Sequence, residues 1–406
     1  MTPDGAGEGA RVGTVVAAVG FTLVVQSITS MAIISPAVIA PVAADAFGVR
    51  PQSIGIFVAA AYCGAMISGL AAGALIARFG ASAVSLLAVG CAAAGLMLGE
   101  TGVLALVPVC AALIGGGHGL VNPASSDILS RAAAPGRMAL IFSIKQTGVP
   151  IGGALAGALV PSLLLALGWQ QALLALGAGS LVLAALLSRV YRSPRASRAV
   201  RHFSLVDALR GLGAPIRLAL SEPALRELSL VSFAYATMQL TLFTYFVSYL
   251  NLELGYTLVL AGLAFSCAQA AGIVGRIVWG FAADRLLGSR AMLAVLGFVM
   301  AASGFAAALF THDWPLVALL AVAIPLGASA IGWNGVYLAE VARRAPAGQV
   351  GMATGGTQFF TFFGAVSGPP IFGIIASTTG GYGSGFAVFS VLPLIVGVRL
   401  ALRRPA

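Results

Sequence analysis

Residues 272–290 read GIVGRIVWGFAADRLLGSR, and they place a positive charge inside an apolar segment. Arg276 is surrounded by apolar residues and glycine, whereas Asp284, Arg285 and Arg290 follow where the apolar run ends. A cation in the hydrocarbon of a bilayer is costly, so such a residue faces protein or a water-filled cavity and marks a path for substrate or ions. Arg276 is therefore the first candidate functional residue.

The composition excludes an ordinary water-soluble protein. Of the 406 residues, 59% are hydrophobic and 8% are charged, whereas about a quarter are charged in soluble domains; the mean hydropathy is +1.01. Apolar runs of roughly 20 residues are long enough to cross a hydrocarbon core of ~30 Å as helices. The sequence predicts an all-α membrane protein with twelve transmembrane helices, near residues 12–34, 53–77, 82–99, 103–129, 138–165, 169–189, 227–250, 257–281, 290–310, 315–340, 350–375 and 384–401.

The net charge of +10 indicates membrane orientation rather than nucleic-acid binding. If the N-terminus is cytoplasmic, every basic residue at the ends of the predicted helices or between them, except Arg50, falls on the cytoplasmic side. We therefore expect a multi-pass membrane protein with both termini in the cytoplasm. The predicted parts are a cytoplasmic N-terminus (1–11), an N-terminal six-helix bundle (12–189), a basic cytoplasmic linker (190–226), a C-terminal six-helix bundle (227–401) and a cytoplasmic C-terminus (402–406).

An internal repeat divides the chain into two similar halves. The segment GALIARFGAS at residues 73–82 returns as GFAADRLLGSR at residues 280–290, an offset of 207 to 208 residues. A repeat of about half the chain length indicates two pseudo-symmetric six-helix bundles. In a second repeated stretch, at an offset of 212, Lys145 corresponds to Thr357. The halves therefore share a structural pattern but not the charge at this position.

These motifs resemble those of the major facilitator superfamily of secondary transporters, over nearly the full chain. The family's loop motif, Gly-x-x-x-Asp-Arg-x-Gly-x-Arg, follows its second and eighth helices, and residues 280–290 match it with one extra residue before Gly288. In the first copy Ala77 replaces the aspartate and Ser82 replaces the last basic residue. The resemblance implies that the motif braces the cytoplasmic ends of the bundles in the outward-facing state. The expected bracing residues are Gly73, Arg78, Gly80, Gly280, Asp284, Arg285, Gly288 and Arg290.

A second basic residue lies deep in the fifth predicted helix. Lys145, the only lysine in the chain, either pairs with Asp127 or Glu340 or forms an anion or coupling site. His118 and Asn122, four residues apart, share a face of the fourth helix. His118 is either a hydrogen-bonded packing residue or, with Asp127 downstream, a group that carries a proton.

Polar and aromatic residues of other helices are candidates for a cavity wall. Tyr235 and Gln239 lie four residues apart in the seventh helix, and Trp333 and Tyr337 do so in the tenth. For the aromatic residues the alternative is packing, and for Gln26 in the first helix it is hydrogen bonding between helices. The expected substrate-binding residues are Arg276, Lys145, Tyr235, Gln239, Trp333, Tyr337, Gln26, Asn122 and Gln358, and the expected coupling residues are His118, Asp127 and Glu340.

The two deep cations predict an anionic substrate. A cavity of net positive charge selects anions, and the planar fork of Arg276 suits a carboxylate. We expect a small organic anion that bridges Arg276 and Lys145. The arginine in the eighth helix is similar to that of bacterial oxalate/formate and monocarboxylate transporters. The resemblance implies alternating access, with cotransport of protons or exchange for another anion.

Several alternatives remain at this point. Efflux of hydrophobic or cationic compounds by a proton antiporter fits the aromatic residues but lacks a deep carboxylate. Glu340 either takes part in coupling or pairs with Arg343 or Arg344 near the cytoplasmic end. No nucleophile and base pair or metal-ligand cluster is visible, so we expect neither an enzyme nor a bound cofactor. We also expect a monomer.

Overall fold

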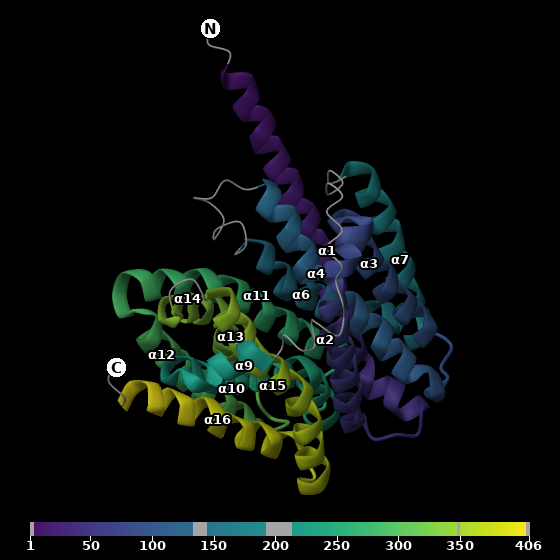
Figure 1. Cartoon of the computed structure of the whole chain (residues 1–406). Coiled ribbons are helices and arrows are strands. Elements are labelled where there is room, and N and C mark those ends of the chain that lie inside the picture. The colour runs from purple at the N-terminus through teal and green to yellow at the C-terminus, as the bar shows by residue number, and fades with distance from the viewer. Residues whose placement is uncertain (1–3, 133–143, 192–212, 347–349, 403–406) are drawn as a thin grey trace. The chain divides into compact units, whose positions relative to one another are not determined.

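The computed structural model describes residues 4–132, 144–191, 213–346 and 350–402, and the regular elements in these ranges are all helices (Figure 1). Within them, 12 helical segments are long and apolar enough to cross a membrane. The prediction of an all-α protein with twelve membrane-length helices is therefore confirmed. The helices are α1 (Asp4–Ala46), α2 (Ile54–Phe79), α3 (Ala81–Gly99), α4 (Val107–Ala132), α6 (Gly148–Leu167), α7 (Trp169–Val190), α9 (Gly213–Ser221), α10 (Pro223–Ser248), α11 (Leu258–Ala282), α12 (Ser289–Ala308), α13 (Leu316–Gly332), α14 (Asn334–Arg344), α15 (Val350–Thr379) and α16 (Tyr382–Leu402).

The first helix is longer than predicted. Instead of ending near residue 34, α1 continues to Ala46 and contains Pro36 and Pro41. Proline is tolerated inside membrane helices because neighbouring helices and polar side chains satisfy the backbone groups that it frees. The sequence prediction ended the helix too early.

The chain forms two compact units that do not coincide with the two halves of the sequence. Unit 1 consists of Met1–Ile33, Ala60–Gly152 and Leu167–Leu205, and unit 2 consists of Ile34–Ala59, Gly153–Ala166 and Val206–Ala406. Helices α1, α2 and α6 therefore contribute residues to both units. The predicted boundaries of the two six-helix bundles stay a prediction.

Each unit is built on close helix pairs. In unit 1, α3 packs against both α4 and α7, and Gly95 of α3 leaves space for Ile114 of α4. In unit 2, α10 is buried over most of its length and packs against α15, while α11 pairs with α13 and α12 pairs with α16. Small residues at such contacts let helix backbones approach closely, as in membrane helices generally.

The backbone repeats the internal symmetry of the sequence. Gly80 precedes α3 with φ 85° and ψ 152°, and Gly288 precedes α12 with φ 76° and ψ 152°, a region that glycine adopts at little cost. The second copy contains one more residue, and Ala283–Leu287 form a π-helical turn that takes it up. Two other pairs of positive-φ glycines recur at similar offsets, Gly48 with Gly255 and Gly168 with Gly380.

Candidate functional site

Arg276 connects α11 to α13 within unit 2. Its Nε donates a hydrogen bond to the carbonyl oxygen of Ile331 at 3.2 Å. Ile331 lies just before Trp333, where the helix is interrupted between α13 and α14. One turn further along α11, Trp279 Nε1 donates to the carbonyl of Ala328 at 2.8 Å. The last four carbonyl groups of a helix, that of Ile331 among them, lack helical partners. Arg276 therefore supplies a donor where α13 ends, and Trp279 supplies a second one within its last turns.

Four predicted residues lie together in the core of unit 2. Trp333 Nε1 donates to Gln239 Oε1 at 3.1 Å, and its ring meets the rings of Tyr235 and Tyr337 edge-on, with centroids 5.7 and 5.2 Å away. Tyr235, Trp333 and Tyr337 are fully buried. The Tyr235 hydroxyl donates to the carbonyl of Leu293 at 2.5 Å. This geometry is that of packed core residues, and their substrate contacts stay a prediction.

Glu340 has local partners on α14. Its carboxylate lies 3.1 Å from Nε of Arg344 and 3.8 Å from Nε of Arg343, which is the ion pairing that the sequence offered as the alternative to a coupling role. Arg343 also donates a hydrogen bond to Ser289 Oγ. Gln358 lies partly buried on α15, and its substrate contact stays a prediction.

Unit 1 contains a polar cluster around the buried Lys145. Lys145 is 2% exposed, and its Nζ donates a hydrogen bond to Oδ1 of Asn122 on α4. His118, one turn before Asn122, is near enough to interact electrostatically with Lys145 and is hydrogen-bonded to the backbone of Thr29 on α1. His118 Nδ1 is buried and has no hydrogen-bond partner among the residues described. Asp127 lies further along α4 and is partly buried.

Gln26 lies beside this cluster on α1. Its Nε2 donates to Ser30 Oγ at 3.2 Å, whereas its buried Oε1 has no partner in the described part of the chain. The side chain packs against Gly148, where an added Cβ would come 2.8 Å from Gln26 Cβ. Gln26 thus hydrogen-bonds within its helix and retains one buried acceptor, so both of its predicted roles remain open.

Arg290 of the loop motif forms an ion pair that the sequence analysis missed. Its Nη1 and Nη2 lie 2.5 and 3.2 Å from the two carboxylate oxygens of Glu227, near the start of α10. Arg399 of α16 places its Nε 3.6 Å from the same carboxylate. Glu227 and Arg290 lie 63 residues apart, so no local pattern could reveal the pair.

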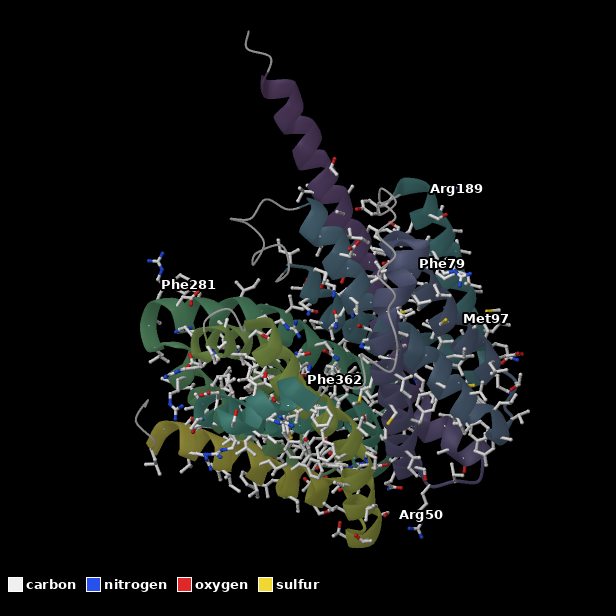
Figure 2. The ribbon with its side chains drawn as sticks, in the orientation of Figure 1. Arg50, Phe79, Met97, Arg189, Phe281 and Phe362 are labelled. Carbon is white, nitrogen blue, oxygen red and sulfur yellow. The ribbon has the colours of Figure 1, made fainter. Side chains whose placement is uncertain are left out.

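The other charged residues of the motif are exposed, and two of its glycines lie within helices. Asp284 and Arg285 are exposed in the π-helical turn, and the exposed Arg78 lies 5.2 Å from the centre of the Phe79 ring. Figure 2 shows the side chain of Phe79, which is 52% exposed. Gly73 and Gly280 lie within α2 and α11. The bracing role of the motif residues stays a prediction.

Gln269 on α11 was not among the predicted site residues. Its side chain is fully buried, and neither amide atom has a hydrogen-bond partner among the described residues. It precedes Arg276 by two helical turns on the same side of α11. That spacing, in an otherwise apolar helix, was the signal by which the sequence could have pointed to it.

Comparison with known proteins gives one consistent result. The sequence profile of the Major Facilitator Superfamily matches residues 20–361. The Hexuronate transporter of Bacillus subtilis (strain 168) is 23% identical over 309 residues, which are 72% of this chain and 73% of that protein. A bacterial homolog of the human lysosomal transporter Spinster, solved in an inward-facing and occupied conformation, has 13% identity and a TM-score of 0.68, with 95% of this chain and 94% of that chain covered.

Two longer relatives come from Oryza sativa subsp. japonica. They are named Probable anion transporter 4, chloroplastic, at 24% identity, and Probable anion transporter 1, chloroplastic, also at 24%. The matches cover 72% and 74% of this chain but only 52% and 60% of those proteins. This chain therefore matches only part of each rice protein.

Proposed function

Because this chain belongs to the major facilitator superfamily, we propose that it moves a small organic anion, recognised by its carboxylate, across the bacterial inner membrane by alternating access. The names of its relatives support an anionic substrate, since they include a hexuronate transporter and two anion transporters. Efflux of lipophilic cations is not favoured, because these names refer to hexuronate and anions. Both termini would lie in the cytoplasm, and the transporter would act as a monomer.

The observation that carries the proposal is a basic side chain held at neutral acceptors inside each unit. Lys145 is buried and donates to the amide oxygen of Asn122, and Arg276 is partly buried and donates to a backbone carbonyl. Each basic side chain adds positive potential to a poorly screened interior, and this favours the binding of an anion.

Uptake into proteoliposomes tests the substrate class. We expect saturable uptake of labelled glucuronate and gluconate, and no uptake of tetraphenylphosphonium, a lipophilic cation. Lys145→Met should weaken carboxylate affinity by roughly tenfold or more, because it removes one charged donor, while Lys145→Arg should retain most of it. Transport of tetraphenylphosphonium with no carboxylate transport would refute the proposal.

His118 is the group best placed to couple a proton to the anion. Its Nδ1 is buried without a partner among the described residues, Lys145 interacts with it electrostatically, and Tyr62 places its ring centre 6.0 Å away. Two positive charges repel strongly in a low-dielectric site. An anion bound at Lys145 would offset this repulsion and let Nδ1 take up a proton. We therefore infer that His118 couples proton uptake to anion binding.

This coupling predicts that the affinity for the anion depends on pH through His118. If anion binding favours protonation of His118, then by linkage protonation favours anion binding, and affinity should rise as pH falls. His118→Gln should give an affinity that changes little between about pH 5 and pH 8, the range in which histidine ordinarily titrates. The measurement is Kd for gluconate at several pH values. If the Kd of His118→Gln changed with pH as that of the parent does, another residue would carry the proton. Asp127→Asn would then be the next variant to measure.

A further inference from the structure

Gln269 is a buried polar side chain that takes no part in the anion binding or the proton coupling proposed above. It is fully buried on α11, and both its Oε1 and its Nε2 lack hydrogen-bond partners among the residues that the structure describes. Burying an amide without partners is unfavourable, and such groups are rare in native proteins. An amide retained at this cost needs a partner that is present at another stage of the protein's cycle.

The surface that covers Gln269 in unit 2 is a glycine-lined stretch of α6. An added Cβ at Gly153 would overlap the amide of Gln269, and one at Gly157 would come 2.5 Å from the carbonyl oxygen of Gly262. Ser266 Oγ donates across the same contact to the carbonyl of Ala154 at 2.8 Å. Glycine lets the two backbones approach closely here. The Gln269 amide is therefore covered by this contact and would be exposed only where the contact opens.

Gln269 and Arg276 emerge on one side of α11. Gly262, Gln269 and Arg276 follow one another at seven-residue intervals, and such positions drift by only about 20° per interval around a helix. The guanidinium lies about 10 Å further along the axis than the amide. When α6 moves away from Gly262, the amide is uncovered on the side of α11 that carries the cation.

We propose that Gln269 determines specificity by contacting hydroxyl groups of a carboxylate that is held by Arg276, in the conformation in which α6 has moved off α11. The inference rests on the proposed function and extends it to a substrate class, the hydroxylated carboxylates. A neutral amide offers two N–H donors and one carbonyl acceptor, which complement a hydroxyl group. A site built to hydrogen-bond a hydroxyl discriminates against the analogue that lacks it, because the polar groups of the site are then left unpaired.

Gln269→Met tests the proposal, because methionine has nearly the same length and lacks the amide. The measurement is Kd of the purified protein for gluconate and for hexanoate, which share a six-carbon chain and differ in their hydroxyl groups. We expect gluconate binding to weaken roughly 10- to 100-fold while hexanoate binding stays within about twofold. Gln269→Asn, which keeps a shorter amide, should recover part of the preference for gluconate.

Ser266→Ala is the matched control, since it removes the hydrogen bond across the same contact and leaves Gln269 intact. It should preserve the ratio of the two Kd values. Equal weakening of both ligands by Gln269→Met, or an equal change of the ratio in Ser266→Ala, would mean that Gln269 has a packing role. A parent protein that binds hexanoate but not gluconate would overturn this inference alone. A parent that binds neither and transports no carboxylate would overturn the proposed function as well.

Discussion

Replacing Arg276 with glutamine is expected to abolish carboxylate binding while the protein remains folded. The substitution removes the fixed charge and the planar fork that a carboxylate would engage with two hydrogen bonds. Loss of two charged hydrogen bonds corresponds to a weakening of about 100-fold or more. Arg276→Lys should keep part of the affinity, because it retains the charge without the fork. Calorimetry with gluconate and glucuronate on purified variants measures the effect.

Trp279→Phe provides the matched control for Arg276. Trp279 donates to the carbonyl of Ala328 much as Arg276 donates to that of Ile331, on the same pair of helices. Its replacement should lower stability by about 1 kcal/mol and leave the Kd for gluconate nearly unchanged. If Trp279→Phe weakened binding as much as Arg276→Gln, the role of Arg276 would be to hold α13 in place rather than to bind the anion.

Glu227→Gln is expected to lower stability markedly, although Glu227 lies outside the candidate site. Glu227 is 8% exposed and pairs with Arg290 through both carboxylate oxygens, with Arg399 beside them. Glutamine would leave two arginines close together without their counter-charge. Breaking a buried pair from one side costs about 3–5 kcal/mol. The arginines are partly solvated, so we expect about 2–3 kcal/mol, seen as a lower Tm in detergent.

Glu340→Gln is the comparison for this effect. Its partners Arg343 and Arg344 lie on the same helix and are 52% and 29% exposed at the side chain. Pairs three and four residues apart on a helix contribute about 0.3–0.5 kcal/mol when they are exposed. Glu340 itself is buried, but both of its partners lie on its own helix, so the Tm should fall less than in Glu227→Gln. The double variant Glu227→Gln with Arg290→Gln should recover stability relative to Glu227→Gln alone. Equal losses in the two single variants would show that Glu227 contributes no more than a pair within one helix.

The membrane fold was predictable because its cause is local. Apolar length alone reveals a segment that can cross a bilayer, and the recurrence of the Gly80 stretch at Gly288 revealed the duplication. The pairing of Glu340 with Arg343 and Arg344 was foreseeable for the same reason, since residues three and four apart meet on a helix. The end of α1 was misjudged because Pro36 and Pro41 are usual helix breakers, and a membrane environment relaxes that rule.

The candidate site was only partly predictable. Helical spacing shows which residues share a face of a helix, but it does not show what that face packs against. Helical spacing correctly grouped Tyr235 with Gln239, but whether that stripe faces a cavity or a neighbouring helix depends on packing with α12 and α13. Lys145 and Asn122 were both chosen as candidates, yet the hydrogen bond between them requires two helices to meet. Gln269 was not chosen as a site residue, because only the structure shows that its amide is buried without a hydrogen-bond partner among the described residues.

One inserted residue normally rotates every later side chain of a helix by about 100°. The second loop motif carries such an insertion, yet α12 starts from nearly the same backbone angles at Gly288 as α3 does at Gly80. The wide turn at Ala283–Leu287 absorbs the residue before the new helix begins. A length change at this place therefore leaves the inward stripe of α12 unrotated, so that α12 presents the same face to its bundle as α3 does.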